Sequence, residues 1–284
     1  MNKMQIDAVK KELSRRVHEL WREFDSVQPA ELLHYTTPSG VRGILGRGEL
    51  WLTDVKDVKN DKREGDYGLD VIKSVVTKLQ TSLPEALVSG VRNLESIYGS
   101  NRAWTQYITC FCSAGEQRNM LSKFADGDGC ALVFDYETLL AGREDVTRGA
   151  LFRVLYDRND QERLIEQTLK HSIDLEAQLD VQDQDCEKEY WGRLVENKLM
   201  MCAIRFKDAR WRREEEFRIM VTSRDGIEVF DDAGGRKRTK LGIKVGDLKR
   251  VIRYGSTQLD EAEIRTLLKK LNFGKDVEIV ESAL

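Results

Sequence analysis

Leu33-His34-Tyr35-Thr36-Thr37 is followed along the chain by Gly43-Ile44-Leu45 and then by Leu50-Trp51-Leu52. The first and last of these stretches are rich in aromatic, β-branched and apolar residues, which predicts two short strands. Pro38-Ser39 predicts the start of a helix between them, because both residues suit the first helical turn. The glycines that follow Leu45 predict the end of that helix.

His34 is one of only three histidines in the chain. In a strand, successive side chains point to opposite faces, so His34 and Thr36 are expected to share one face and Tyr35 to lie on the other. A histidine in a short strand is more often structural than catalytic. An imidazole beside a hydroxyl can nevertheless hold a sugar hydroxyl or a phosphate, so we treat His34 and Thr36 as a candidate ligand-binding pair.

The composition is that of a globular protein, since 40% of the 284 residues are hydrophobic and 33% are charged. This length allows one large domain or two small ones, each with a full core. The formal net charge is -3. A protein that binds nucleic acid by electrostatics alone would have a strongly positive net charge, so the composition does not indicate one. The first residues lack the apolar core of a signal peptide, and no uncharged run reaches the ~20 residues that span a bilayer. We therefore expect a cytoplasmic protein without a membrane partner.

Strands and helices alternate unevenly along the chain, which predicts an α+β fold and not a regular βαβ array. Apolar residues at three- and four-residue steps predict a helix in an N-terminal segment, residues 1–29. The remainder, residues 30–284, is expected to form a single domain. Its segment from about 157 to 202 is strongly charged and helical in pattern, and we interpret it as an insertion of two helices.

Phe111-Cys112-Ser113 ends the strongest predicted strand. Cys110 and Cys112 fall on one face, but no nearby cysteine or histidine completes a set of metal ligands, so no metal site is expected. A nucleophilic Cys112 with His34 as its base is an alternative, although buried packing is the usual role of such thiols. Ser113 lies at the strand end beside a polar loop, where it is better placed to contact a ligand.

A late strand combines an apolar face with a charged face. Phe217, Ile219 and Val221 share the first, while Glu214, Glu216 and Arg218 share the second. A row of two carboxylates and a guanidinium suits a cleft that binds ribose hydroxyls or a cationic transition state. A solvated charged face is an equally good interpretation of this pattern. The loop that begins at Asn60 is interpreted either as a turn before the next helix or as part of the same site.

With these pieces in this order, the chain resembles a large bacterial family catalogued only as domain of unknown function 2971. The resemblance runs from about residue 30 to 272. Its motifs are His34-Tyr35-Thr36, Gly43-Ile44-Leu45, Gly48-Glu49-Leu50-Trp51, Asn60-Asp61-Lys62-Arg63-Glu64, Phe111-Cys112-Ser113, Gly129 to Phe134, and Trp211 to Arg218.

The first half of the pattern is also similar to ADP-ribosyltransferases that modify DNA and RNA, and to RNA 2′-phosphotransferases. This resemblance implies an ADP-ribosyltransferase-like split β-sheet core that binds NAD as a substrate. It implies that His34 meets one of the two riboses and that Thr36 and Ser113 line the nicotinamide pocket. It implies that Glu216 orients the ribose 2′-hydroxyl, with Glu214 as the second candidate. Arg218 or Arg118 would hold the pyrophosphate. Tyr35 and Asn60 are expected among the cofactor-binding residues.

The function implied is NAD-dependent ADP-ribosyl transfer to a nucleic acid or a protein, by a bacterial toxin or a phage-defence effector. Two alternatives remain open, an NAD glycohydrolase and a non-catalytic ligand-binding module on the same fold. Leu121 and Phe124 stand where members of the family usually carry Trp and Tyr, which favours the binding module. The intact His34, Ser113 and Glu216 favour an enzyme.

Overall fold

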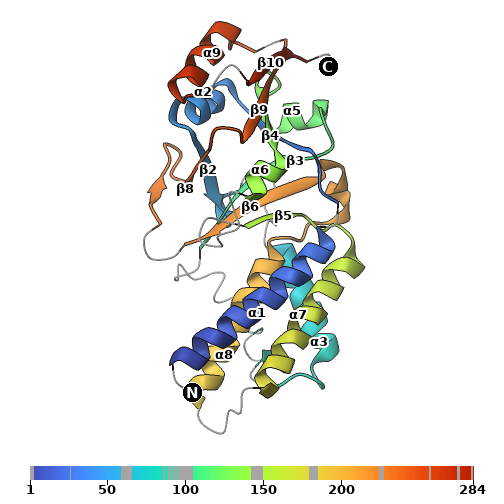
Figure 1. Ribbon diagram of the computed structural model, residues 1–284. Coiled ribbons are helices and arrows are strands. Elements are labelled where there is room, and N and C mark those ends of the chain that lie inside the picture. Colours follow the sequence, from blue (N-terminus) through green and yellow to red (C-terminus); the bar gives the residue numbers. More distant parts are fainter. Residues whose placement is uncertain are drawn as a thin grey trace. The chain divides into compact units, whose positions relative to one another are not determined.

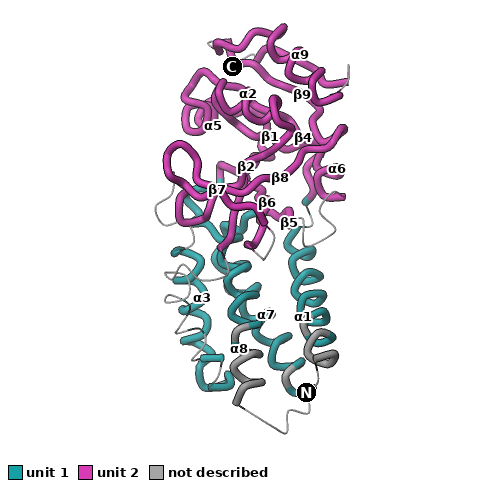
Figure 2. The backbone as a smooth tube through the Cα atoms, turned by 90° about the vertical axis from the view of Figure 1, so that its left-hand side faces the viewer, with its two compact units in different colours: residues 1–27, 59–102, 154–212 teal, residues 28–58, 103–153, 213–284 magenta. Residues whose placement is uncertain are grey.

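The computed structural model describes the chain except residues 1–2, 26, 59–65, 86, 89–90, 92–93, 95–104, 142–149, 179–184, 224–226, 256, 274–275 and 283. The chain forms two compact units, each built from three separate segments (Figure 2). Unit 1 comprises residues 1–27, 59–102 and 154–212, and unit 2 comprises residues 28–58, 103–153 and 213–284. The N-terminal helix and the segment expected as an insertion therefore belong to the same unit.

Unit 1 is helical in the part that the structure describes (Figure 1). Helix α1 packs against α7, and α3 packs against both α7 and α8. The two helices expected between 157 and 202 are present, and the break between them lies outside the described residues. The bounds are α1 Lys3–Phe24, α3 Asp66–Leu79, α7 Arg158–Gln178 and α8 Asp185–Ala203.

A glycine allows close approach of α3 to α8. A Cβ atom added at Gly68 would lie 2.3 Å from the carbonyl oxygen of Ala203 and 2.6 Å from its Cα. Because backbone atoms cannot move aside as a flexible side chain would, Gly68→Ala is expected to lower the free energy of unfolding by about 1–3 kcal/mol. Gly192→Ala in α8 is the control, since an added Cβ there meets no atom within 4 Å.

Urea denaturation followed by circular dichroism measures this difference. The control substitution is expected to leave stability unchanged or raise it by up to about 1 kcal/mol, because alanine is the better helix former. Equal stability of the two variants would contradict the close α3–α8 approach.

Unit 2 contains a ten-stranded mixed sheet, which confirms the expected α+β class. Its main path runs β10-β9-β4-β1-β3-β2-β8-β7, while β6 pairs with β3 and β5. Strand β10 is parallel to β9, and the other pairings are antiparallel. The strands are β1 Glu31–Thr36, β2 Glu49–Asp54, β3 Gln106–Cys112, β4 Cys130–Asp135, β5 Ala150–Arg153, β6 Glu216–Thr222, β7 Val229–Asp231, β8 Lys237–Gly242, β9 Leu248–Arg253 and β10 Glu278–Glu281. The helices are α2 Pro38–Arg47, α5 Arg118–Phe124, α6 Tyr136–Ala141 and α9 Glu261–Lys270.

The helix between β1 and β2 forms as its sequence predicts. The hydroxyl of Thr37 accepts a hydrogen bond from the backbone N–H of Gly40, and Pro38 occupies the first turn. At the other end, Gly48 adopts a left-handed backbone with φ of 69°, and its N–H donates to the carbonyl of Ile44. Both caps satisfy backbone groups that a helix end leaves without partners.

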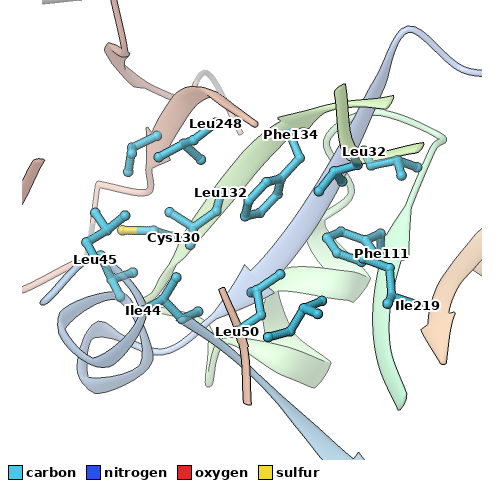
Figure 3. Close-up of a cluster of buried hydrophobic side chains, with 14 of the residues drawn as sticks. Leu32, Ile44, Leu45, Leu50, Phe111, Cys130, Leu132, Phe134, Ile219 and Leu248 are labelled. Carbon is cyan, nitrogen blue, oxygen red and sulfur yellow. The ribbon is translucent and has the colours of Figure 1, made fainter. Parts of the chain in front are cut away.

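The two faces of the sheet carry different side chains. The core face is the side of Leu32 and Phe111, which lie in an apolar cluster with Ile44 and Leu45 of α2 (Figure 3). Phe217 and residues of α9 belong to the same cluster. The α5 face is the side of Leu33, Tyr35 and Cys112, which pack with Met120 and Leu121 of α5.

Strand β3 has three strand neighbours. Strand β6 pairs with it along its whole length, from Gln106 to Cys112. On the opposite edge, β1 pairs at Cys112 and β2 pairs at Tyr107 and Ile108. Strands β1 and β2 therefore pair with this edge at different positions, β1 at the end of β3 and β2 near its start.

Candidate functional site

His34 lies in β1, beside β3. Its Nδ1 is 2.9 Å from the carbonyl oxygen of Cys110, which lies on β3 between the residues that pair with β1 and those that pair with β2. Because a carbonyl only accepts, Nδ1 carries the proton and donates, which leaves Nε2 as an acceptor. The ring lies 5.7 Å from that of Phe111, so His34 is on the core face. Burial lowers the pKa of His34, and the hydrogen bond to Cys110 opposes this only in part.

The lowered pKa of His34 predicts a loss of stability in acid. The folded state holds the imidazole neutral, whereas the unfolded chain takes up a proton below about 6.5. The stability that depends on neutral His34 is therefore present above this pH and is lost as the pH falls. His34→Asn keeps an amide donor near Nδ1 but does not titrate. In urea denaturation from pH 7.5 to 5.5, the stability advantage of the wild type over this variant is expected to shrink. An advantage that stays constant would contradict the assignment.

The side chains of Tyr35 and Thr36 both contact other residues of unit 2. Tyr35 is buried on the α5 face, where its hydroxyl accepts from the N–H of Gln117 at 2.8 Å and donates to the carbonyl of Gly115 at 3.1 Å. It thus fastens the loop between β3 and α5. The hydroxyl of Thr36 lies directly against α2, since a Cβ added at Gly40 would be 2.0 Å from its Oγ1. As expected, Tyr35 faces away from His34 and Thr36.

Glu216 and Arg218 form a buried ion pair on the α5 face. The guanidinium donates from Nε to Oε1 at 2.7 Å and from a second nitrogen to Oε2 at 3.2 Å. The side chains are 5% and 1% exposed, respectively. Glu216 lies directly opposite Cys112 in the β3–β6 register, which fixes its face. Each charge neutralises the other, and this is the geometry of a structural pair.

Glu214 is also neutralised by a cation. Its carboxylate lies 2.5 Å from the Nζ of Lys123 in α5, and its side chain is 6% exposed. This contact joins α5 to Glu214, the last residue of the short 3-10 helix Ala209–Glu214 that precedes β6. The chain's run of three glutamates therefore places two of them in buried ion pairs.

Glu215 differs from its two neighbours because it is exposed. Its backbone has a φ of 40°, a left-handed conformation that residues with side chains rarely adopt. Its carbonyl accepts from the N–H and from the hydroxyl of Ser113, both at 3.1 Å. Its carboxylate lies 3.4 Å from the same hydroxyl. Strained residues of this kind are concentrated at functional sites.

The structure does not bring all the predicted site residues together. Strand β3 ends at Cys112, so Ser113 lies just beyond it and the alternation of the strand does not assign Ser113 to either face. Ser113 is held by its hydrogen bonds to the carbonyl of Glu215. Glu216 and Arg218 lie on the α5 face, so the register does not bring them to His34. Asn60 lies outside the described residues, and Arg118 is exposed at the start of α5.

The alternative role for Cys112 is not favoured by its surroundings. Burial raises the pKa of its thiol to about 11, so the thiolate is scarce at neutral pH. Cys112 also lies on the α5 face, whereas His34 lies on the core face, so the imidazole is not placed to act as its base.

Sequence reasoning missed three residues of this site: Glu215, Lys123 and Gln117. Strict alternation had placed Glu214 and Glu216 on one face and gave Glu215 no role. The left-handed backbone at Glu215 breaks that alternation, and no residue type in the run signals it. The pairing of Lys123 with Glu214 joins positions 91 residues apart, so only the fold reveals it.

Residues 120–219 match the model of a family described as "Protein of unknown function (DUF2971)". This supports the resemblance to that family over a segment that includes Lys123 and all three glutamates. No curated protein and no solved structure matched the chain in the comparisons. Among the helices that the structure describes, none is long and apolar enough to cross a membrane.

Proposed function

We propose that unit 2 is an NAD-dependent ADP-ribosyltransferase domain of the split-sheet type. The observation that carries the proposal is the contact of the exposed Glu215 carboxylate with the hydroxyl of Ser113. Ser113 directly follows β3, the strand whose Cys110 carbonyl accepts from His34. A second support is the position of His34 beside β3, between the β1 and β2 pairings, where Nδ1 donates to Cys110 and Nε2 is left as an acceptor. The proposed acceptor is a nucleic acid or a protein, and the proposed role is that of a toxin or phage-defence effector.

The transfer breaks the bond between the ribose C1′ and the nicotinamide nitrogen. The bonding electron pair leaves with nicotinamide, and an acceptor atom bonds to C1′ and loses its proton. Positive charge develops on the ribose as the bond breaks, and an anion fixed beside it stabilises that charge. Glu215 supplies such an anion. Its carboxylate is also the acceptor that a ribose 2′-hydroxyl requires.

Geometry favours Glu215 over Glu216 in this role. A carboxylate held by a buried guanidinium has little capacity left for a substrate hydroxyl, whereas Glu215 is exposed beside a single hydroxyl. In the same way, Arg118 is better placed than the buried Arg218 to contact a pyrophosphate. We propose that the Nε2 of His34 accepts a hydrogen bond from a ribose hydroxyl, since Nδ1 is already committed as a donor.

Release of nicotinamide from NAD, measured with purified protein and with cell lysate as a source of acceptor, tests this proposal. Glu215→Gln is expected to reduce the rate about 100-fold or more, by analogy with removing one group that stabilises transition-state charge. His34→Ala is also expected to reduce it. Glu228→Gln, an exposed glutamate on the β7–β8 side, is the matched control and should leave the rate unchanged. Label from NAD that appears on a macromolecule would identify the acceptor class.

Glu216→Gln distinguishes the two carboxylates. If this variant loses release while Glu215→Gln retains it, Glu216 is the catalytic carboxylate and our assignment is wrong. If the wild-type protein releases no nicotinamide and binds no NAD in calorimetry, the transferase proposal fails. Binding without release would favour the non-catalytic module, which the mutual neutralisation of Glu216 and Arg218 also supports.

A further inference from the structure

The backbone around Glu215 is held by contacts with α5 and with the segment that links β3 to α5. The side-chain amide of Gln117 donates to the carbonyl of Arg213 at 3.2 Å. Lys123 contacts the carboxylate of Glu214 at 2.5 Å. Ser113 donates its N–H to the carbonyl of Glu215. Three consecutive residues are thus held by groups from one segment, residues 113–123.

We infer that Lys123 is a positioning residue for Glu215, acting through Glu214. The consequence for activity rests on the proposed function, whereas the contact itself does not. The left-handed backbone at Glu215 is unfavourable for a residue with a side chain, so it persists only where the surroundings impose it. The ion pair fixes the residue immediately before Glu215 and supplies part of that constraint.

Because Glu214 is buried, we expect the loss of Lys123 to change the position of Glu214. Loss of the Lys123 ammonium would remove one partner of a buried ion pair and leave a carboxylate that is only 6% exposed, which is strongly unfavourable. Glu214 would gain solvation by turning toward water. The next residue would then relax toward an ordinary backbone conformation and carry its carboxylate away from Ser113.

Hydrogen exchange and nicotinamide release, measured on the same variants, test the inference. Lys123→Met keeps the aliphatic length but removes the charge, while Lys123→Arg restores a cation. Lys237→Met is the control, because Lys237 forms an exposed ion pair with Asp231. In Lys123→Met, exchange of the Ser113 amide is expected to be at least about tenfold faster, since local opening exposes it. Nicotinamide release should fall by at least about tenfold at a temperature where the variant is fully folded, with KM little changed.

Rescue of both effects by Lys123→Arg, with no effect of the control, supports the positioning role. Unchanged exchange in Lys123→Met overturns it, and so does faster exchange with unchanged release. If the wild-type protein releases no nicotinamide, the proposed function fails by that result, and exchange at Ser113 still decides whether Lys123 holds the Glu215 backbone. A merely structural lysine would lower the melting temperature without changing release at low temperature.

Discussion

Arg218→Met is expected to lower the free energy of unfolding by about 3–5 kcal/mol, the usual cost of removing one partner of a buried ion pair. Arg218 is 1% exposed, and it holds both carboxylate oxygens of Glu216. Methionine fills much of the same volume but cannot neutralise Glu216. The charge would then remain in the interior of the sheet, where solvation is poor. Urea denaturation followed by circular dichroism measures the change.

Two further variants separate the charge effect from packing. Replacing both residues with methionine removes both charges, so most of the lost stability is expected to return. Arg265→Met removes an exposed partner of Glu261 in α9 and is expected to cost under about 1 kcal/mol. If Arg218→Met is as mild as Arg265→Met, then the Glu216 carboxylate does not need the Arg218 guanidinium for stability, and a ligand-binding role for Arg218 would regain support.

The strand assignments were predictable because each depends on a local pattern. The alternation in β1 placed Tyr35 opposite His34, and the alternation in β6 separated Phe217 from Arg218, as the structure shows. The caps of α2 were predictable for the same reason. Thr37 and Gly48 act on backbone groups within one or two turns of the chain.

The composition of the site was less predictable, because it depends on register between distant strands. Whether His34 and Glu216 share a face is decided by two pairings, Leu33 with Cys112 and Cys112 with Glu216. Neither pairing is encoded in the residues of one strand alone. The same is true of the ion pairs. A run of three glutamates gives no indication of which one remains exposed until the positions of Lys123 and Arg218 are known.

Unit 1 also contains a buried ion pair, Arg205 with Asp25. The loss of stability is expected to depend on which of the two partners is replaced. The Arg205 guanidinium is 0% exposed, lies 2.5 Å from the carboxylate of Asp25 and sits 5.0 Å above the Trp21 ring. Asp25 is 14% exposed at its side chain, so it has some contact with water. Asp25→Asn leaves a fully buried cation without this anion, whereas Arg205→Met leaves an anion that can reach solvent.

Asp25→Asn is therefore expected to cost about 3–5 kcal/mol of unfolding free energy, and Arg205→Met less. Tryptophan fluorescence during urea denaturation follows the unfolding, and Trp21, under the guanidinium, is one of the five tryptophans that contribute to the signal. Arg163→Met is the matched control in the same unit. Arg163 also pairs with an aspartate and stacks on an aromatic ring, Phe24, but it is 58% exposed, so its loss should be small. A greater loss from Arg205→Met than from Asp25→Asn would show that packing of the long side chain on Trp21, and not the buried charge, dominates the energy of this contact.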